Sequence, residues 1–83
     1  MSRNALLGLF EKTATMIAER DLGQVQESTA IATLGIDSLG MLELVGEMER
    51  ALGIHLPDDQ LVGLQTVRDL LDLVERRTEL AVP

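Results

Sequence analysis

The sequence predicts an all-α fold: a small four-helix bundle with a long loop between its first two helices and a short third helix. Three observations support this prediction. Apolar residues recur at helical spacing in three separate segments. Aromatic residues are nearly absent, with one Phe and no Tyr or Trp, so the core must be built from aliphatic side chains, which suit packed helices. The 83 residues are enough for one small domain, and we expect residues 1–83 to form it.

The first helix is predicted over residues 3–19, where charged side chains face away from an apolar stripe. The stripe is formed by Leu6, Leu7, Phe10, Ala14, Ile17 and Ala18. Residues 21–37 show no sustained period and are predicted to form a long loop. Loops of this length are often functional or packed by their own side chains. Four apolar residues are expected to anchor this one: Val25, Ile31, Leu34 and Ile36.

The second helix is predicted over residues 38–52 and ends at Gly53, a residue type common at helix C-termini. Helical periodicity places one stripe of it toward the core: Met41, Leu44, Val45, Met48, Ala51 and Leu52. Leu39 and Leu42 point away from this stripe. Single surface leucines are common. Two of them beside a serine at a helix start, among acidic residues, indicate a small docking patch.

The third and fourth helices follow a proline and a pair of aspartates. A short helix is predicted over residues 58–62, closed by a glycine. The last helix is predicted to begin at Thr66, with Asp69 three positions on as a variant of the capping box. Its apolar positions are Val67, Leu70, Leu71 and Val74. We expect this helix to fade in the charged segment 75–79 and residues 81–83 to form a frayed end.

Composition narrows the classes of function. The net charge of -7 repels nucleic acid and anionic membranes, and it attracts basic patches on other proteins. Without cysteine there is no disulfide, thiolate metal site or cysteine nucleophile, and we expect no bound metal. No apolar run approaches the roughly 20 residues that span a bilayer. The N-terminal segment is amphipathic rather than a signal peptide, so a soluble cytoplasmic protein is expected.

Ser38 has three candidate roles. It could cap the helix, but Asp37 is well placed to do so and would leave the serine hydroxyl in solvent. It could be a nucleophile, but the single histidine, His55, lies beyond the same helix, which is about 20 Å long, and no G-x-S-x-G motif is present. Catalysis by this chain alone is therefore not expected. It could be an attachment point, because a phosphodiester suits a helix N-terminus. The residues permit this role without selecting it.

Two adjoining segments, LGIDSLGMLELVGEMERALGIHLP and PDDQLVGLQTVRDLLDLV, closely resemble the acyl carrier protein family, in which a D-S-L motif opens the second helix. The resemblance covers residues 34–74, and the first helix agrees only in pattern and length. D-S-L alone is a weak signal. Combined with E-L, G-I-x-L-P-D and T-V-x-x-L at these spacings, it is a strong one.

The resemblance implies that Ser38 carries 4′-phosphopantetheine, transferred from coenzyme A by a separate phosphopantetheinyl transferase, with Asp37 as part of the motif. An acyl chain would ride on the terminal thiol as a thioester, and the carrier itself would not be an enzyme. Acyl-loading enzymes and enzymes of the ketosynthase or acyltransferase type, with basic docking patches, would be partners of a monomeric carrier. By match to the family, partners would recognise Leu39, Leu42, Glu43 and Glu47.

Some residues depart from the fatty-acid type of carrier. Gly40 stands where an acidic residue is typical, Gly46 where a bulkier apolar one is common, and Arg50 interrupts the acidic end of the helix. The thinner acidic surface favours a carrier of a polyketide or other specialised pathway, such as antibiotic biosynthesis, over one of fatty acid biosynthesis. Peptidyl and aminoacyl carriers of this fold usually have Gly-Gly-x-S around the serine, so Asp37 favours the acyl type.

Other classes of function stay open beside the carrier. The main one is an unmodified interaction module that binds a partner helix through Leu39 and Leu42; a small serine hydrolase is a third. For a carrier, a medium-length apolar chain is hypothesised to slip into a seam between the second and third helices. The seam would be lined by Val45, Met48, Leu61 and Val62.

Overall fold

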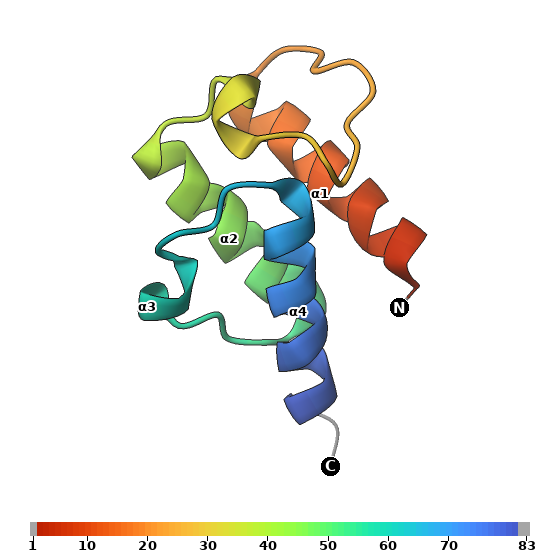
Figure 1. Cartoon of the computed structure of the whole chain (residues 1–83), viewed down its shortest axis with the longest axis vertical. Coiled ribbons are helices and arrows are strands. Elements are labelled where there is room, and N and C mark those ends of the chain that lie inside the picture. Colours follow the sequence, from red (N-terminus) through yellow and green to blue (C-terminus); the bar gives the residue numbers. More distant parts are fainter. Residues whose placement is uncertain (1, 82–83) are drawn as a thin grey trace.

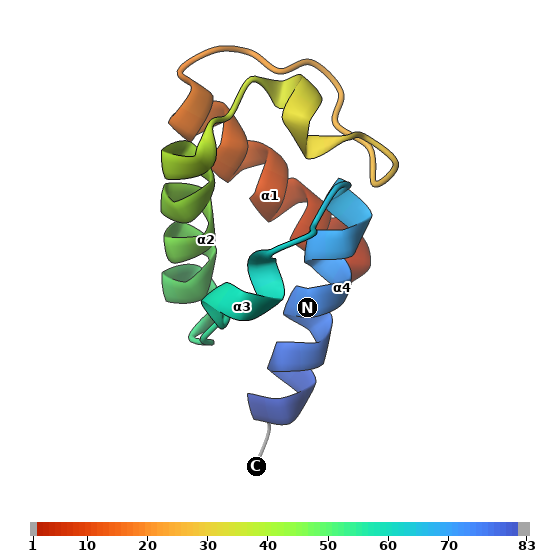
Figure 2. The same cartoon turned by 60° about the vertical axis from the view of Figure 1, so that its left-hand side comes forward.

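The computed structural model describes the backbone of residues 2–81 and the side chains of residues 2–78. The elements follow in the order α1 (Arg3–Ala18), the 3₁₀ turn η1 (Ile31–Leu34), α2 (Ser38–Leu52), α3 (Asp58–Leu61) and α4 (Val67–Ala81). This confirms the predicted all-α fold with a long loop and a short third helix. The two views show α1, α2 and α4 as the three long helices (Figures 1 and 2), and in the view of Figure 2 α3 is seen between the lower end of α2 and α4.

Helix α1 begins and ends close to the predicted residues. The Ser2 hydroxyl accepts a hydrogen bond from the Ala5 N–H at 3.1 Å and caps its start. Glu19, which was expected inside the helix, is instead its C-cap, with a left-handed φ of 56°. The buried residues include Leu6 and Phe10, whose side chains pack into a core of aliphatic groups. No helix within residues 2–81 has the length and apolar character required to cross a membrane.

The loop between α1 and α2 is tied to the start of α4. The Val67 N–H donates to the Thr29 carbonyl at 3.0 Å, and the Arg68 N–H donates to the Glu27 carbonyl at 2.9 Å. First-turn N–H groups of a helix have no partner within the helix, so these bonds satisfy donors that would otherwise need water. The Ile31 N–H donates to the Gln65 carbonyl at 2.9 Å on the same side. The loop is thereby fixed where the sequence shows only an irregular segment.

Three of the four predicted loop anchors are buried: Val25, Ile31 and Leu34. Ile36, the fourth, is half-buried and packs against the core. The turn η1 was not predicted, because its four residues have no periodic pattern and it is held by contacts with residues more than 30 positions away. It ends at Gly35, two residues before the cap of α2.

Helix α2 runs over the predicted residues and buries Leu44, Val45 and Met48. Ala51, which the periodicity assigned to the core stripe, is exposed. At about 100° per residue Ala51 lies about 70° from the centre of the three buried positions, and its methyl group is too short to reach back. Its placement in the core was therefore wrong.

Helix α4 begins with a reciprocal cap. The Asp69 N–H donates to the Thr66 hydroxyl at 3.2 Å, and Asp69 Oδ2 accepts from the Thr66 N–H at 3.1 Å, as the capping-box pattern predicted. The hydrogen bond from the Thr66 backbone N–H is the main reason why the pKa of the Asp69 carboxyl lies below its ordinary value.

Two predictions about where α3 and α4 end need correction. The last helix does not fade in the charged segment but continues to Ala81, because Glu and Arg are good helix formers and Arg77 Nε donates to the His55 carbonyl at 3.1 Å. Residue 81 is thus helical, and residues 82–83 of the expected frayed end lie outside the described residues. The third helix ends at Leu61, so Val62 is not part of it.

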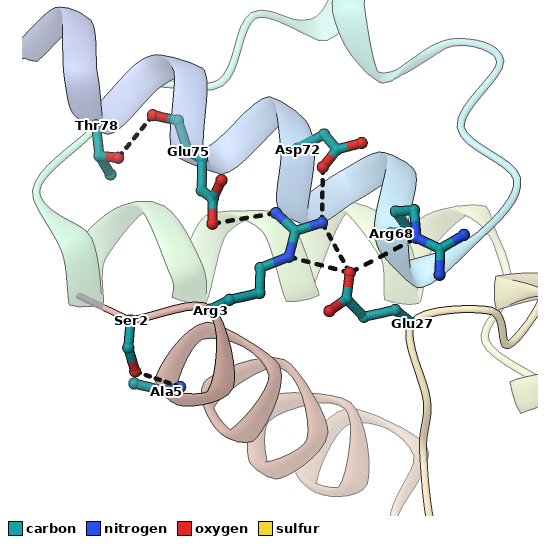
Figure 3. Close-up of polar contacts among 8 residues, drawn as sticks. All are labelled: Ser2, Arg3, Ala5, Glu27, Arg68, Asp72, Glu75 and Thr78. Carbon is teal, nitrogen blue, oxygen red and sulfur yellow. Dashed lines mark hydrogen bonds and ion pairs between the residues drawn. The ribbon is translucent and has the colours of Figure 1, made fainter.

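A group of ion pairs around Arg3, here the Arg3 cluster, joins the start of α1 to the loop and to α4 (Figure 3). Arg3 Nη2 lies 2.8 Å from Glu27 Oε1 and 2.6 Å from Asp72 Oδ1, while Nη1 lies 3.2 Å from Glu75 Oε1. Arg68 Nε lies 3.7 Å from the same Glu27 oxygen. The hydrogen bond from Arg3 holds the pKa of the Glu27 carboxyl below its ordinary value. Three segments distant in sequence are thereby linked by one guanidinium.

Candidate functional site

The start of α2 presents Ser38 without using its hydroxyl. Asp37 is the N-cap: its backbone is extended, and its Oδ1 accepts a hydrogen bond from the Gly40 N–H at 2.7 Å. The Met41 N–H donates to the Asp37 carbonyl at 2.8 Å and begins the helical hydrogen bonding. Ser38 is the first helical residue and is exposed, and its hydroxyl has no hydrogen-bond partner among the side chains of residues 2–78. The cap therefore does not use the serine hydroxyl.

The surroundings of Ser38 supply no base for catalysis. His55 lies past the far end of α2, a helix of 15 residues and hence about 22 Å long. Its Nδ1 is 3.2 Å from Glu49 Oε2, so its nearest charged partner is at that end as well. An activated serine needs a base within hydrogen-bond reach. Among the side chains of residues 2–78, none that could act as a base is hydrogen-bonded to the Ser38 hydroxyl.

An open hollow of about 500 Å³ lies beside Ser38. It is formed by three segments: the loop around η1, the first turn of α2, and the stretch between α3 and α4. Most of its lining is apolar, and the lining residues are Ala30, Ile31, Ala32, Ile36, Asp37, Ser38, Met41, Leu64 and Gln65. Met41, assigned to the core stripe by its position, is half-buried because its side chain faces this hollow. Sequence reasoning missed the hollow because no single segment encodes it.

The residues predicted for partner recognition share the outer face of α2. Leu39 and Leu42 are 66% and 56% exposed, which is unusual for leucine side chains in a small domain. Glu43 is exposed and has no basic side chain within ion-pair distance among the described residues. Glu47 is half-buried and forms an ion pair with Arg50 on the next turn. The two glutamates therefore differ: one carboxylate is free and the other is engaged.

The residues predicted for an acyl-chain seam are not all on one surface. Val45 and Met48 are buried in the core, and Leu61 is partly buried against it. Val62 is 83% exposed. The sequence prediction that placed Val62 in the seam is therefore corrected. Helix α3 ends one residue earlier than predicted, so the backbone at Val62 is extended and its side chain lies in solvent. None of these four residues lines the hollow beside Ser38.

Comparison with known proteins places this geometry in context. A family profile described as "Phosphopantetheine attachment site" matches residues 6–74. The chain is 33% identical over 75 residues to the acyl carrier protein of Clostridium perfringens, covering 86% of this chain and 99% of that protein. It is 35% identical over 66 residues to a bikaverin polyketide synthase of Gibberella fujikuroi, covering 76% of this chain and 3% of the synthase.

A solved structure shares the whole fold. The crystal structure of an acyl carrier protein from Thermotoga maritima superposes with a TM-score of 0.88 at 28% sequence identity. The match covers 98% of this chain and 95% of the other. The arrangement of three long helices and one short helix is therefore common to both proteins.

Proposed function

The chain belongs to the family of phosphopantetheine-binding acyl carrier proteins, and on that basis we propose that Ser38 is the residue to which 4′-phosphopantetheine is attached. Acyl carrier proteins are carriers and not enzymes. One observation carries the proposal: Ser38 is the exposed first residue of α2, with a free hydroxyl, because Asp37 caps the helix. In the modification, the Ser38 oxygen would bond to the phosphorus that carries the pantetheine arm, and the P–O bond that joins this phosphorus to the rest of the coenzyme A diphosphate would break. The adenosine bisphosphate part would leave with the bridging oxygen, and the transferase would accept the serine proton.

The start of α2 fits the group that Ser38 would hold. The N–H groups of Ser38 and Leu39 have no partner within the helix, since the Asp37 side chain takes the Gly40 N–H and helical bonding begins with Met41. A phosphodiester on Ser38 would lie at the positive end of the helix dipole, where its negative charge is favoured. When loaded, the arm supplies a thiol that holds acyl groups as thioesters. The chain's own part is to present Ser38, to keep its hydroxyl unbonded and to offer a recognition face.

The recognition face is proposed to consist of Leu39, Leu42, Glu43 and Glu47 on α2. Exposed leucines contribute apolar area to a docked complex, and acidic groups around them attract enzymes with basic patches. Partner enzymes would be a phosphopantetheinyl transferase, acyl-loading enzymes, and enzymes of the ketosynthase or acyltransferase type.

The pathway is proposed to be polyketide or other specialised biosynthesis. Its support is the similarity to a segment of a polyketide synthase, together with Gly40 and Arg50, which thin the acidic surface near the arm. The Glu47–Arg50 ion pair adds to this effect by engaging one of the recognition carboxylates.

The cargo has two candidate locations. The seam of Val45, Met48 and Leu61 must open before a chain can enter, because Val45 and Met48 are buried. The hollow beside Ser38 is already open and mostly apolar. We propose that an apolar acyl chain first occupies the hollow, because the chain can enter it without separating any helices.

Intact-mass spectrometry after coexpression with a phosphopantetheinyl transferase tests the proposed function. The wild-type chain is expected to gain the mass of one phosphopantetheinyl group, and Ser38→Ala is expected to gain none. Ser28→Ala, which removes another serine, is the matched control and should be modified like the wild type. A wild-type chain that stays unmodified would favour the unmodified interaction module instead.

A further inference from the structure

Gly40 lies in the first turn of α2, where the end of α1 packs closely against it. A Cβ atom at this position would lie 2.9 Å from Ile36 Cγ2, 3.2 Å from Asp37 Oδ1 and 3.3 Å from Ile17 Cγ2. The first distance is shorter than real Cβ contacts, so a side chain here would force its neighbours to move. The Gly40 N–H also donates to the Asp37 cap. Gly40 thus donates the N–H of the cap and, because it has no side chain, also leaves room for Ile17 of α1.

Gly46 on the same helix shows that this contact is specific to Gly40. A Cβ atom at Gly46 would have one neighbour within 4 Å, Arg50 Nη1 at 3.9 Å, which is the flexible end of a side chain on α2 itself. The two glycines share a helix and differ in their neighbours and in their position, since Gly40 lies in the first turn and Gly46 in the interior. They form a matched pair for substitution.

Arg20, just beyond the C-cap of α1, makes a second contact with the segment before Ser38. Its Nη2 donates to the Leu34 carbonyl at the end of η1. A Cβ atom at Gly35 would lie 2.7 Å from that nitrogen, so a side chain there would displace the Arg20 guanidinium, and the φ of 73° favours glycine at this position. Among the side chains of residues 2–78, no carboxylate lies within ion-pair distance of Arg20. The carbonyl is its polar partner.

From these contacts we propose that Ile17 and Arg20, at the end of α1, are positioning residues for the modification of Ser38. Ile17 fixes the first turn of α2 through Gly40, and Arg20 fixes the turn that leads into Asp37. Together they contact the segment 34–40, part of which also lines the open hollow beside Ser38. The proposal rests on the proposed attachment at Ser38 and adds residues outside the D-S-L motif.

The position of Ser38 matters because its oxygen must approach the phosphorus of coenzyme A in line with the bond that breaks, inside the transferase. A displacement of a reacting group by about 1 Å can cost a factor of about 100 in rate. Neither Ile17 nor Arg20 lies on the exposed recognition face of α2, so their loss should affect the reaction step more than the docking of the transferase. This separates the proposal from a docking role.

The first test compares Gly40→Ala with Gly46→Ala in transferase kinetics. Alanine favours a helix over glycine at both positions, so intrinsic propensity alone predicts equal behaviour. We expect Gly40→Ala to lower kcat by about five-fold or more while KM changes by less than about two-fold. Gly46→Ala should keep the wild-type values. Equal kcat for both variants would show that the close packing of Ile36, Asp37 and Ile17 around Gly40 does not position Ser38, and it would overturn the role of Ile17.

The second test compares Arg20→Met with Arg20→Lys. Methionine keeps an apolar stem but has no N–H donor, whereas lysine keeps a donor for the Leu34 carbonyl. We expect Arg20→Met to lower kcat by about three-fold or more and Arg20→Lys to recover most of the loss. The difference in kcat between the two variants should persist in about 0.5 M NaCl. An effect that came from surface charge alone would be screened at this salt concentration and would disappear. A rise in KM without a fall in kcat would show that Arg20 contributes to docking of the transferase, and it would overturn the proposal.

Failure of the inference is distinguishable from failure of the proposed function. If the wild type is not modified, the attachment at Ser38 is wrong. If the wild type is modified and all variants share its kcat, only the positioning role is wrong. Circular dichroism checks that each variant is folded at the assay temperature. Should Gly40→Ala not fold, the Arg20 pair decides, since Arg20 is exposed and its variants are expected to fold.

Discussion

At the scale of single residues, two neighbouring polar side chains have separate tasks. Asp37 binds the Gly40 N–H and fixes the helix start, and this leaves Ser38 with a free hydroxyl in solvent. A serine that had to cap the helix would have its oxygen occupied. The sequence alone left cap, nucleophile and attachment point open. The hydrogen bonds of the cap and the distance to His55 are what separate these roles.

This division of tasks predicts unequal costs for two alanine substitutions. Asp37→Ala removes the cap and should lower the free energy of unfolding by about 1 kcal/mol. Ser38→Ala removes an unbonded surface hydroxyl and should change it by less than about 0.5 kcal/mol. Urea unfolding followed by circular dichroism measures both. If Ser38→Ala were as costly as Asp37→Ala, the serine hydroxyl would have a structural role.

At the scale of elements, the outer face of α2 makes a prediction about its two glutamates. Glu43 has no basic side chain within ion-pair distance among residues 2–78, whereas Glu47 is paired with Arg50. Replacing Glu43 by Lys should therefore raise the KM of the transferase more than replacing Glu47 by Lys, and the gap should narrow as salt screens the charges. Steady-state kinetics at low and high salt measure this. Unchanged KM values for both variants at low salt would remove these residues from the recognition face.

The hollow between elements makes a prediction about cargo length. Burial of each methylene contributes roughly 0.8 kcal/mol, so an octanoyl chain has far more to gain from an apolar hollow than an acetyl group. In a comparison of octanoyl-loaded and acetyl-loaded protein, we expect NMR methyl shifts at Ile31, Ile36 and Met41. Shifts centred on Val45 and Met48 would show that the buried seam opens instead. No shifts at either set would place the cargo outside the protein.

The elements also show how far the sequence can predict this molecule. Helix α2, its glycine end and the Thr66–Asp69 cap were predictable because each depends on residues within one or two turns. The turn η1, the hollow and the Arg3 cluster depend on contacts between residues that are distant in sequence. Periodicity could not show that Ala51 is exposed or that α3 ends before Val62, because these follow from where a short side chain or a chain turn meets solvent.

At the scale of the whole molecule, the Arg3 cluster predicts how stability depends on pH. The pKa of Glu27 in the folded protein lies below its ordinary value of 4.5, chiefly because of its hydrogen bond with Arg3. The unfolded chain therefore binds the proton more readily, and this stabilisation is present above pH 4.5 and is lost as pH falls through the lowered pKa. The cluster joins α1, the loop and α4, so its loss should loosen the support of the loop.

Arg3→Gln tests this prediction. At neutral pH the variant should melt at a lower temperature than the wild type. Between about pH 5 and pH 3 its melting temperature should fall less steeply, because Glu27 no longer has the partner that lowers its pKa. Arg68→Gln is the control, since Arg68 is exposed and lies farther from the same carboxylate, at 3.7 Å. Parallel melting curves for Arg3→Gln and the wild type would contradict the role of the cluster.

The attachment of phosphopantetheine to Ser38 is the central claim, and fragment mass spectrometry of the modified chain tests it most directly. Cleavage after Arg20 and Arg50 releases residues 21–50, which contain both Ser28 and Ser38, so fragmentation within this peptide must assign the added group. We predict that every fragment retaining Ser38 carries the mass of one phosphopantetheinyl group and that fragments with Ser28 alone carry none. An added group on Ser28, or an unmodified peptide after complete reaction with transferase and coenzyme A, would contradict the claim.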